Sequence, residues 1–159
     1  MSDTNAPLSR RTFCAGACQV ATLATMFAAC GGGSSSSSPT SPSASAATML
    51  GTVAGRFAGN TVQVTAAGSA LTDVGGAVLV NSVAGVFLLA RTSATAFQAI
   101  EAVCTHEGCT ITGADGATYV CPCHGSRYDR SGHVLLGPAT SSLRQYTTAF
   151  ADGVVTIAL

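Results

Sequence analysis

Side chains that can bind metal are concentrated in one short stretch of this sequence. Residues 104–124 hold four of the chain's seven cysteines and two of its three histidines. Each half of the stretch supplies one thiolate and one imidazole at close spacing, Cys104 with His106 and Cys121 with His124. Two loops that each present one thiolate and one imidazole can hold two iron atoms with different ligand sets. One iron is bound by cysteine sulfur and the other by histidine nitrogen. The clustering therefore predicts a metal centre.

The segment that must position these side chains has the pattern of short β-strands. Residues 49–159 are enough for one small domain, and no part of them shows a sustained helical apolar period. Apolar or alternating stretches recur between turn residues, and we expect strands at 61–65, 77–80, 86–90, 97–103, 118–120, 143–150 and 154–159. Ala151-Asp152-Gly153 supplies the turn of a C-terminal hairpin. The pattern predicts an all-β fold, an antiparallel sandwich or barrel.

Residues 1–30 are typical of an export segment. The arginine pair Arg10 and Arg11 precedes a weakly apolar run, as in twin-arginine signals. The run ends at Phe27-Ala28-Ala29-Cys30, which resembles a bacterial lipobox and makes Cys30 a candidate lipidation site. The alternative is a retained membrane anchor, although the run is shorter than the roughly 20 apolar residues that span a bilayer. Either interpretation predicts an exported, membrane-attached protein whose domain lies on the periplasmic or extracytoplasmic side.

Residues 31–48 have the composition of a flexible linker. They read GGGSSSSSPTSPSASAAT and contain no charge and no large apolar side chain. Such a segment cannot bury enough surface to offset the entropy of ordering. We therefore expect a tether between the export segment and the domain.

The charge balance argues against a nucleic-acid partner. Lysine and arginine together number 7, as do aspartate and glutamate, so the formal net charge is +0. A protein that binds nucleic acid without specific contacts depends on an excess of positive charge. Only 9% of residues are charged and 6% are aromatic, so the apolar content is mostly small aliphatic side chains.

The two ligand groups resemble the paired sequence boxes of Rieske iron-sulfur proteins. The boxes read CTHEGC at 104–109 and CPCHGS at 121–126. They are similar in particular to the high-potential subgroup found in quinol-cytochrome c oxidoreductase, the cytochrome bc complex. The resemblance implies a Rieske-type 2Fe-2S cluster, an all-β Rieske domain, and a cluster-binding part at about residues 100–140. It assigns one iron to cysteine and the other to histidine, with the ligands Cys104, Cys121, His106 and His124.

The same resemblance gives roles to residues beside the ligands. Each box of the subgroup carries a second cysteine, which implies a disulfide between Cys109 and Cys123 that clamps the two loops. Ser126 is expected to donate a hydrogen bond to a cluster sulfur, and Tyr128 to a cysteine sulfur. Such donors stabilise the reduced cluster and raise its potential toward the upper part of the Rieske range, about −150 to +300 mV.

Two further features follow from the resemblance. Gly137 and Pro138 resemble the start of the loop that covers the cluster in the subgroup, although Thr140 replaces its usual second proline. An imidazole bound to ferric iron is more acidic than free imidazole, so reduction should bring proton uptake at His106 and His124. Family members accept an electron and a proton from a quinol in this way.

Other uses of the ligand residues remain open at this stage. Soft ligands in this number can hold a tetrahedral zinc, and four cysteines can form two disulfides in a small exported domain. Neither alternative requires the small and turn-forming residues that accompany the ligands, which are Gly108, Pro122, Gly125 and Ser126.

One position departs from the family pattern. Glu107 stands where quinol-oxidising members commonly have an apolar leucine that packs at the quinol pocket. A carboxylate there disfavours an apolar pocket and favours a basic or polar partner surface.

Three functional classes are consistent with these observations. The leading hypothesis is the iron-sulfur subunit of a quinol-cytochrome c oxidoreductase-type complex, with quinol, a cytochrome b and a cytochrome c as redox partners. The alternative is a stand-alone, membrane-tethered Rieske carrier that serves another exported oxidoreductase or cytochrome. An oxygenase ferredoxin is disfavoured, because those cytosolic carriers generally lack the second cysteine pair and an export signal. In each class the protein transfers electrons, and any enzymatic activity belongs to the assembly.

Overall fold

The computed structural model describes residues 47–159, and almost all regular structure in them is β-strand. The predicted export residues Arg10 and Arg11 and the lipidation candidate Cys30 lie outside the described residues. Apart from one 3₁₀ turn, η1 (Ala70–Thr72), the elements are strands. Within this part of the chain, no helix has the length and apolar character needed to pass through a membrane. The predicted all-β fold is confirmed.

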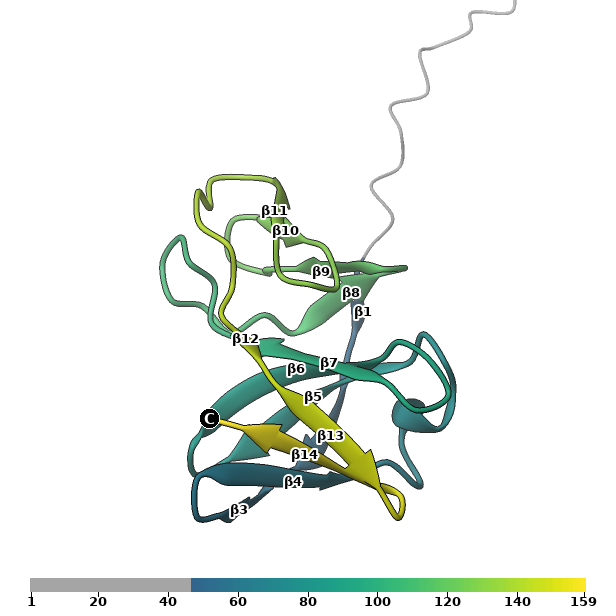
Figure 1. The fold of residues 1–159 in the computed structure, drawn as a ribbon. Coiled ribbons are helices and arrows are strands. Elements are labelled where there is room, and N and C mark those ends of the chain that lie inside the picture. Colours follow the sequence, from purple (N-terminus) through teal and green to yellow (C-terminus); the bar gives the residue numbers. More distant parts are fainter. Residues whose placement is uncertain (1–46) are drawn as a thin grey trace, which may run out of the picture. The chain divides into compact units, whose positions relative to one another are not determined.

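The strands form three sheets. Sheet A has the order β1-β8-β9-β10-β11, sheet B the order β12-β7-β6-β5-β2, and sheet C the order β13-β14-β4-β3. Sheet A lies at one end of the domain, and sheets B and C make up the rest (Figure 1). The strand bounds are β1 (Thr48–Met49), β2 (Gly51–Ala54), β3 (Arg56–Ala58), β4 (Thr61–Thr65), β5 (Ala77–Ser82), β6 (Gly85–Arg91), β7 (Phe97–Glu101), β8 (Gly113–Asp115), β9 (Thr118–Val120), β10 (Arg127–Tyr128), β11 (Val134–Leu136), β12 (Gln145–Tyr146), β13 (Thr148–Ala151) and β14 (Val154–Ala158).

The central strands of sheet B, β5 and β6, are buried on both faces, which explains why residues 77–80 and 86–90 are continuously apolar in sequence. Successive side chains of a strand point to opposite faces. In β5, Val78 and Val80 therefore pack into the core shared with sheet C, while Ala77 and Leu79 pack into a second core beneath sheet A. That second core also contains Tyr119 and Tyr128 from sheet A, so sheet B is the support on which sheet A rests.

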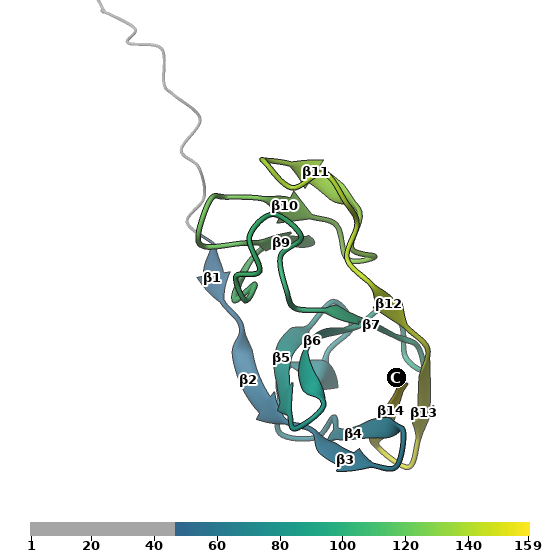
Figure 2. The same ribbon diagram turned by 90° about the vertical axis from the view of Figure 1, so that its left-hand side faces the viewer.

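The start of the described chain connects all three sheets. The strand β1 pairs with β8 of sheet A, and β2 then pairs with β5 of sheet B. After Gly55, β3 pairs with β4 of sheet C. Figure 2 shows this segment running along one side of the domain, past each sheet in turn.

The strand predictions were wrong in several places. The strand expected at 97–103 ends at Glu101, and Val103 forms only an isolated bridge with Thr110. The strand expected at 143–150 is divided into β12 and β13. The β2–β5 pair is parallel, whereas antiparallel pairing was expected. Strands β1, β2, β3, β8, β10 and β11 were not predicted, because strands of 2 to 4 residues are too short to show a period.

Candidate functional site

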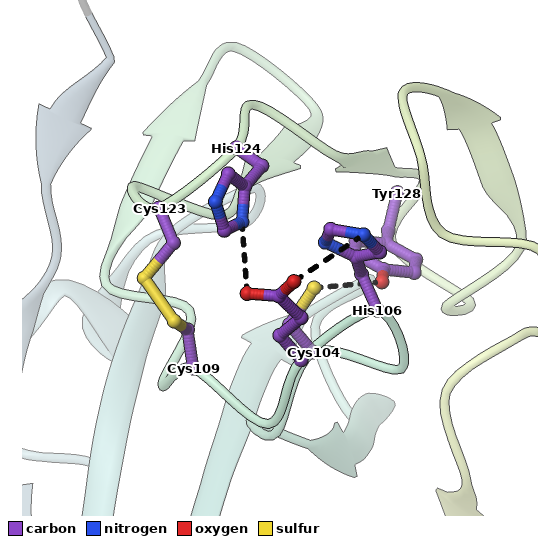
Figure 3. The surroundings of a disulfide bond; sticks show 7 residues. Cys104, His106, Cys109, Cys123, His124 and Tyr128 are labelled. Atoms are coloured by element: carbon purple, nitrogen blue, oxygen red, sulfur yellow. Dashed lines mark hydrogen bonds and ion pairs between the residues drawn. A yellow bond between two sulfur atoms is a disulfide. The ribbon is translucent and has the colours of Figure 1, made fainter.

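Two loops of matching geometry lie side by side at the exposed end of sheet A (Figure 3). Loop 1 (residues 104–109) leads from β7 toward β8, and loop 2 (residues 121–126) joins β9 to β10. In loop 1 the amide of Cys104 donates to the carbonyl of Cys109 at 2.8 Å, and the amide of Gly108 donates back to the carbonyl of Cys104 at 2.9 Å. Loop 2 repeats both bonds at the equivalent positions, at 2.9 and 3.1 Å. Each loop is therefore closed by its own backbone.

A glycine in the left-handed region is what lets each loop close. Gly108 and Gly125 both have a φ of 73°, a conformation that residues with a Cβ rarely adopt. A Cβ added at either position would meet nothing within 4 Å. The requirement for glycine is therefore conformational and does not arise from crowding.

The first residue of each loop is a buried cysteine with a free thiol. Cys104 is 3% exposed and Cys121 is 2% exposed. Burial raises the pKa of the Cys104 thiol, but hydrogen bonds from Tyr128, the His106 amide, Cys121 and Ser126 lower it by more, so it lies below its ordinary value. Burial and the neighbouring Cys104 raise the pKa of Cys121. The site thus already favours negative charge on the Cys104 sulfur.

The imidazoles of His106 and His124 lie together at the outer side of the loops. Their ring centroids are 4.9 Å apart and their planes are nearly perpendicular, at 88°. The side chain of His106 is 28% exposed and that of His124 is 49% exposed. The four residues predicted as ligands are therefore brought together, with the sulfurs inside and the imidazoles facing solvent.

The predicted disulfide between Cys109 and Cys123 is present. It joins loop 1 to loop 2, as Figure 3 shows, and Cys121 lies beside it, with its sulfur within 4.8 Å of both bonded sulfurs. Because Cys104 and Cys121 are free, the two-disulfide alternative does not fit this part of the chain. The bond leaves two thiols and two imidazoles as the cysteine and histidine donors of the two loops, and the Glu107 carboxylate lies beside the imidazoles.

The residues expected to tune the cluster also lie at this site. The hydroxyl of Tyr128 is 3.2 Å from the Cys104 sulfur. Ser126 is completely buried, and its oxygen accepts a hydrogen bond from the amide of Ala139 at 3.2 Å. This contact leaves the Ser126 proton available for another acceptor.

Sequence reasoning missed the contribution of Thr105. Its amide donates to the Tyr128 hydroxyl at 3.3 Å, and its own hydroxyl donates to the carbonyl of Ser141 at 2.6 Å. Since the Thr105 proton is used in this way, the Tyr128 proton remains for either the Thr105 oxygen or the Cys104 sulfur. A charged acceptor forms the stronger bond, so a Cys104 thiolate orients the hydroxyl toward sulfur. A threonine next to a ligand gives no sequence signal for this role.

The segment that begins at Gly137 packs directly against loop 2. A Cβ on Gly137 would lie 2.6 Å from the Cα of Ser126, and the residue has a φ of 103°. Pro138 is exposed and Ala139 is buried, so the chain passes over the edge of loop 2 and is held there by the Ser126 contact.

A second polar cluster lies in the β10–β11 turn, apart from the ligand residues. One carboxylate oxygen of Asp129 accepts hydrogen bonds from the amide and hydroxyl of Ser131 and from the amide of His133. The Nδ1 atom of His133 contacts both the Ser131 hydroxyl at 2.8 Å and Asp129 at 3.2 Å. A nucleophilic triad needs the two contacts on different ring nitrogens, so this cluster stabilises the turn.

The family model of the Rieske [2Fe-2S] domain matches residues 58–147. The chain belongs to the Rieske family. Its cofactor is a Rieske-type 2Fe-2S cluster, which agrees with the donor set found in loops 1 and 2.

Relatives of this Rieske domain include proteins named as iron-sulfur subunits of cytochrome b6-f complexes. It is 56% identical over 45 residues to the cytochrome b6-f complex iron-sulfur subunit of Prochlorococcus marinus. The aligned region covers 28% of this chain and 25% of the relative. The domain is 36% identical over 62 residues to the corresponding subunit of Chlorobaculum tepidum, which covers 38% and 34%. The chain thus spans only 25% to 34% of the length of these curated relatives.

Among solved structures, the cyanobacterial plasma membrane Rieske protein of Synechocystis is similar to this Rieske domain. The TM-score is 0.47 at 27% sequence identity, with 52% of this chain and 86% of the other covered.

The disulfide should contribute substantially to stability. Replacing both Cys109 and Cys123 with serine releases a loop of sequence separation 14, which increases the entropy of the unfolded chain. We expect the cluster-free protein to lose about 3 kcal/mol in free energy of unfolding, measured by urea titration. The unmutated protein treated with reductant is the matched comparison. A change within about 0.5 kcal/mol would contradict a clamping role.

The Asp129 turn should make stability depend on acidity. Burial raises the pKa of the Asp129 carboxyl, but the hydrogen bonds from Ser131 and His133 lower it by more, so it lies below its ordinary value. A carboxyl whose pKa is lower in the folded state stabilises the protein above its unfolded pKa, about 4, and loses that effect as pH falls through the folded value.

Replacing Asp129 with asparagine tests this dependence. The difference in free energy of unfolding between the wild type and Asp129→Asn should shrink as pH falls below about pH 4. Asp152→Asn, in the exposed β13–β14 turn, is the control for loss of a carboxylate. A difference for Asp129→Asn that does not vary with pH would contradict the assignment.

Proposed function

We propose that this Rieske domain is a one-electron carrier in which Cys104 and Cys121 bind one iron of the cluster and His106 and His124 bind the other. The observation that supports this most directly is the equivalence of loops 1 and 2. Each begins with a buried free cysteine and carries one histidine, while the second cysteine of each is used in the disulfide. When bound, the cluster supplies a centre that gains and loses one electron.

The different exposure of the ligands determines where electrons enter and leave. The two cysteines are almost completely buried, whereas His106 and His124 are 28% and 49% exposed. A redox partner therefore approaches the imidazoles. Each ring has one nitrogen for the metal and a second that can exchange a proton with solvent or substrate. Proton uptake at these two rings accompanies reduction, which suits the domain to a quinol as electron donor.

Hydrogen-bond donors around the sulfurs set a high potential. The Tyr128 hydroxyl lies 3.2 Å from the Cys104 sulfur, and the buried Ser126 keeps a proton available for another acceptor. Donors directed at sulfur stabilise the additional negative charge of the reduced state. Gly137 packs against loop 2, and on this proposal the segment that starts with Gly137 and Pro138 covers the cluster.

For the whole protein, we propose the iron-sulfur subunit of a quinol-cytochrome c oxidoreductase-type complex. Its relatives are named as iron-sulfur subunits of cytochrome b6-f complexes, and its partners on this proposal are quinol, a cytochrome b and a cytochrome c. Residues 1–30 direct export through a twin-arginine signal that contains Arg10 and Arg11. They also attach the protein to the membrane, either by lipidation at Cys30 or as a retained anchor. The linker predicted at 31–48 leads into β1, which already begins at Thr48, and the domain predicted at 49–159 works on the periplasmic or extracytoplasmic side.

A stand-alone, membrane-tethered carrier is the second candidate. The observation that favours it is Glu107, whose exposed carboxylate lies at the imidazole end of the loops. A charged group there is costly to bury in an apolar quinol pocket.

The ligand assignment can be tested by composition and spectroscopy. The purified protein should contain iron and acid-labile sulfide, and the reduced protein should give a paramagnetic resonance signal. Cys104→Ala should lose both, because one iron loses a ligand, whereas His133→Ala should keep both, since His133 lies in the β10–β11 turn. The midpoint potential should fall as pH rises through the histidine ionisations. Zinc without sulfide would contradict the assignment, and a low, pH-independent potential would contradict quinol coupling.

Purification from membranes distinguishes the two candidate assemblies. As a complex subunit, the full chain should co-purify in mild detergent with a b-type cytochrome, detected by its reduced-minus-oxidised spectrum. The control is the same purification with the chain lacking residues 1–46, which should reduce recovery with the membrane fraction. Recovery of the membrane-bound full chain without haem would favour the stand-alone carrier.

A further inference from the structure

Glu107 lies at the meeting point of the two exposed imidazoles. It follows His106 in loop 1, and its side chain is 58% exposed. One carboxylate oxygen is 3.9 Å from Nε2 of His106, and the other is 3.6 Å from Nδ1 of His124. The dashed lines that end at the His106 and His124 rings in Figure 3 mark these two contacts. It is therefore the charged group that a partner meets when it approaches the imidazoles.

The described part of the chain provides no lysine or arginine to neutralise this carboxylate. Within residues 47–159, the basic side chains within 4 Å of Glu107 are the two histidines, which carry a charge only when protonated. Arg127 is paired with Asp115 at 3.0 Å, and the guanidinium groups of Arg91 and Arg130 donate to backbone carbonyls. The negative charge of Glu107 at the imidazole end can therefore act on both the redox centre and an approaching partner.

We propose that Glu107 determines two properties of this end of the domain. Its charge lowers the midpoint potential of the centre held by His106 and His124, and it selects a protein partner that presents a lysine or arginine beside its redox group. The inference rests on the proposed function, because it requires a redox centre at the two histidines. It identifies a tuning and specificity residue and the chemistry of the partner surface.

The effect on potential follows from the charge of the electron. Reduction adds one negative charge to the centre, and a fixed carboxylate beside its exposed ligands repels that charge. Two unit charges about 4 Å apart still interact appreciably in water, and more strongly where solvent is partly excluded. The charged Glu107 therefore stabilises the oxidised state relative to the reduced state, and a neutral side chain at this position would not. The Glu107 effect opposes that of the hydrogen-bond donors around the sulfurs.

The effect on partner choice follows from the cost of desolvation. A carboxylate buried against an apolar surface loses its hydration without compensation. A cationic group on the partner restores an interaction and guides the encounter. Complementary charge also disfavours acidic surfaces, since like charges brought together cost free energy. The described contacts of Glu107 thus fit a basic protein surface.

A redox titration of charge variants tests the first property. Glu107→Gln removes the charge and keeps the shape, Glu107→Asp keeps the charge, and Asp152→Asn removes a carboxylate in the β13–β14 turn. At the wild-type midpoint and fixed pH, the reduced-to-oxidised ratio of Glu107→Gln should be about three to ten times higher, which is about 30 to 60 mV for one electron. Glu107→Asp and Asp152→Asn should titrate close to the wild type.

The iron and sulfide content of each preparation separates the two ways in which the titration can fail. Protein that is loaded with the cluster but shows no shift for Glu107→Gln, or an equal shift for Asp152→Asn, would overturn the proposal for Glu107 alone. Wild-type protein that contains zinc and no sulfide would overturn the proposed function, and the proposal for Glu107 with it.

Oxidants of opposite charge test the second property. The reduced protein is mixed by stopped flow with the cation tris(phenanthroline)cobalt(III) or with the anion ferricyanide. The ratio of the cation rate to the anion rate should fall about threefold or more in Glu107→Gln at low ionic strength, and salt should diminish the difference. Because a change in driving force affects both oxidants in the same direction, the ratio reports mainly the charge at the contact. An unchanged ratio, or an equal fall in Asp152→Asn, would overturn selection by Glu107.

Discussion

The reciprocal backbone hydrogen bonds that close loops 1 and 2 are the constraint on which the site depends. They place a cysteine at the start of each loop, against the core beneath sheet A, and turn the histidines outward. The disulfide, the Tyr128 contact and the approach of Gly137 all presuppose loops of this shape. The same pair of backbone hydrogen bonds closes both loops. In each loop this geometry buries the sulfur of the first cysteine and exposes the imidazole.

The parts of the fold that could be predicted are those where side chains carry the information. The strands β5 and β6 are buried on both faces and are continuously apolar, so their sequence alone indicated them. The short strands of sheet A, such as β8 and β10, are defined by their pairing partners and have no pattern of their own. The boundaries at Glu101 and around Thr147 likewise depend on where neighbouring strands end.

The site was predictable in composition but not in its supporting contacts. The spacing of cysteine and histidine indicated a metal centre, and the resemblance to a known family implied the disulfide that the structure contains. The links from Thr105 to Tyr128 and from Ala139 to Ser126 join residues far apart in sequence. No local pattern marks them, because they arise only when sheet A brings loop 1, loop 2 and the segment after β11 together.

The passage of the first strands through all three sheets has a mechanical consequence. A load applied on the N-terminal side of Thr48 first reaches the two residue pairs of β1 with β8, which belong to the sheet that carries the redox loops. The longer ladders of β2 with β5 and of β3 with β4 come later along the chain. Tension on the N-terminal side is therefore felt at sheet A before it reaches the main core.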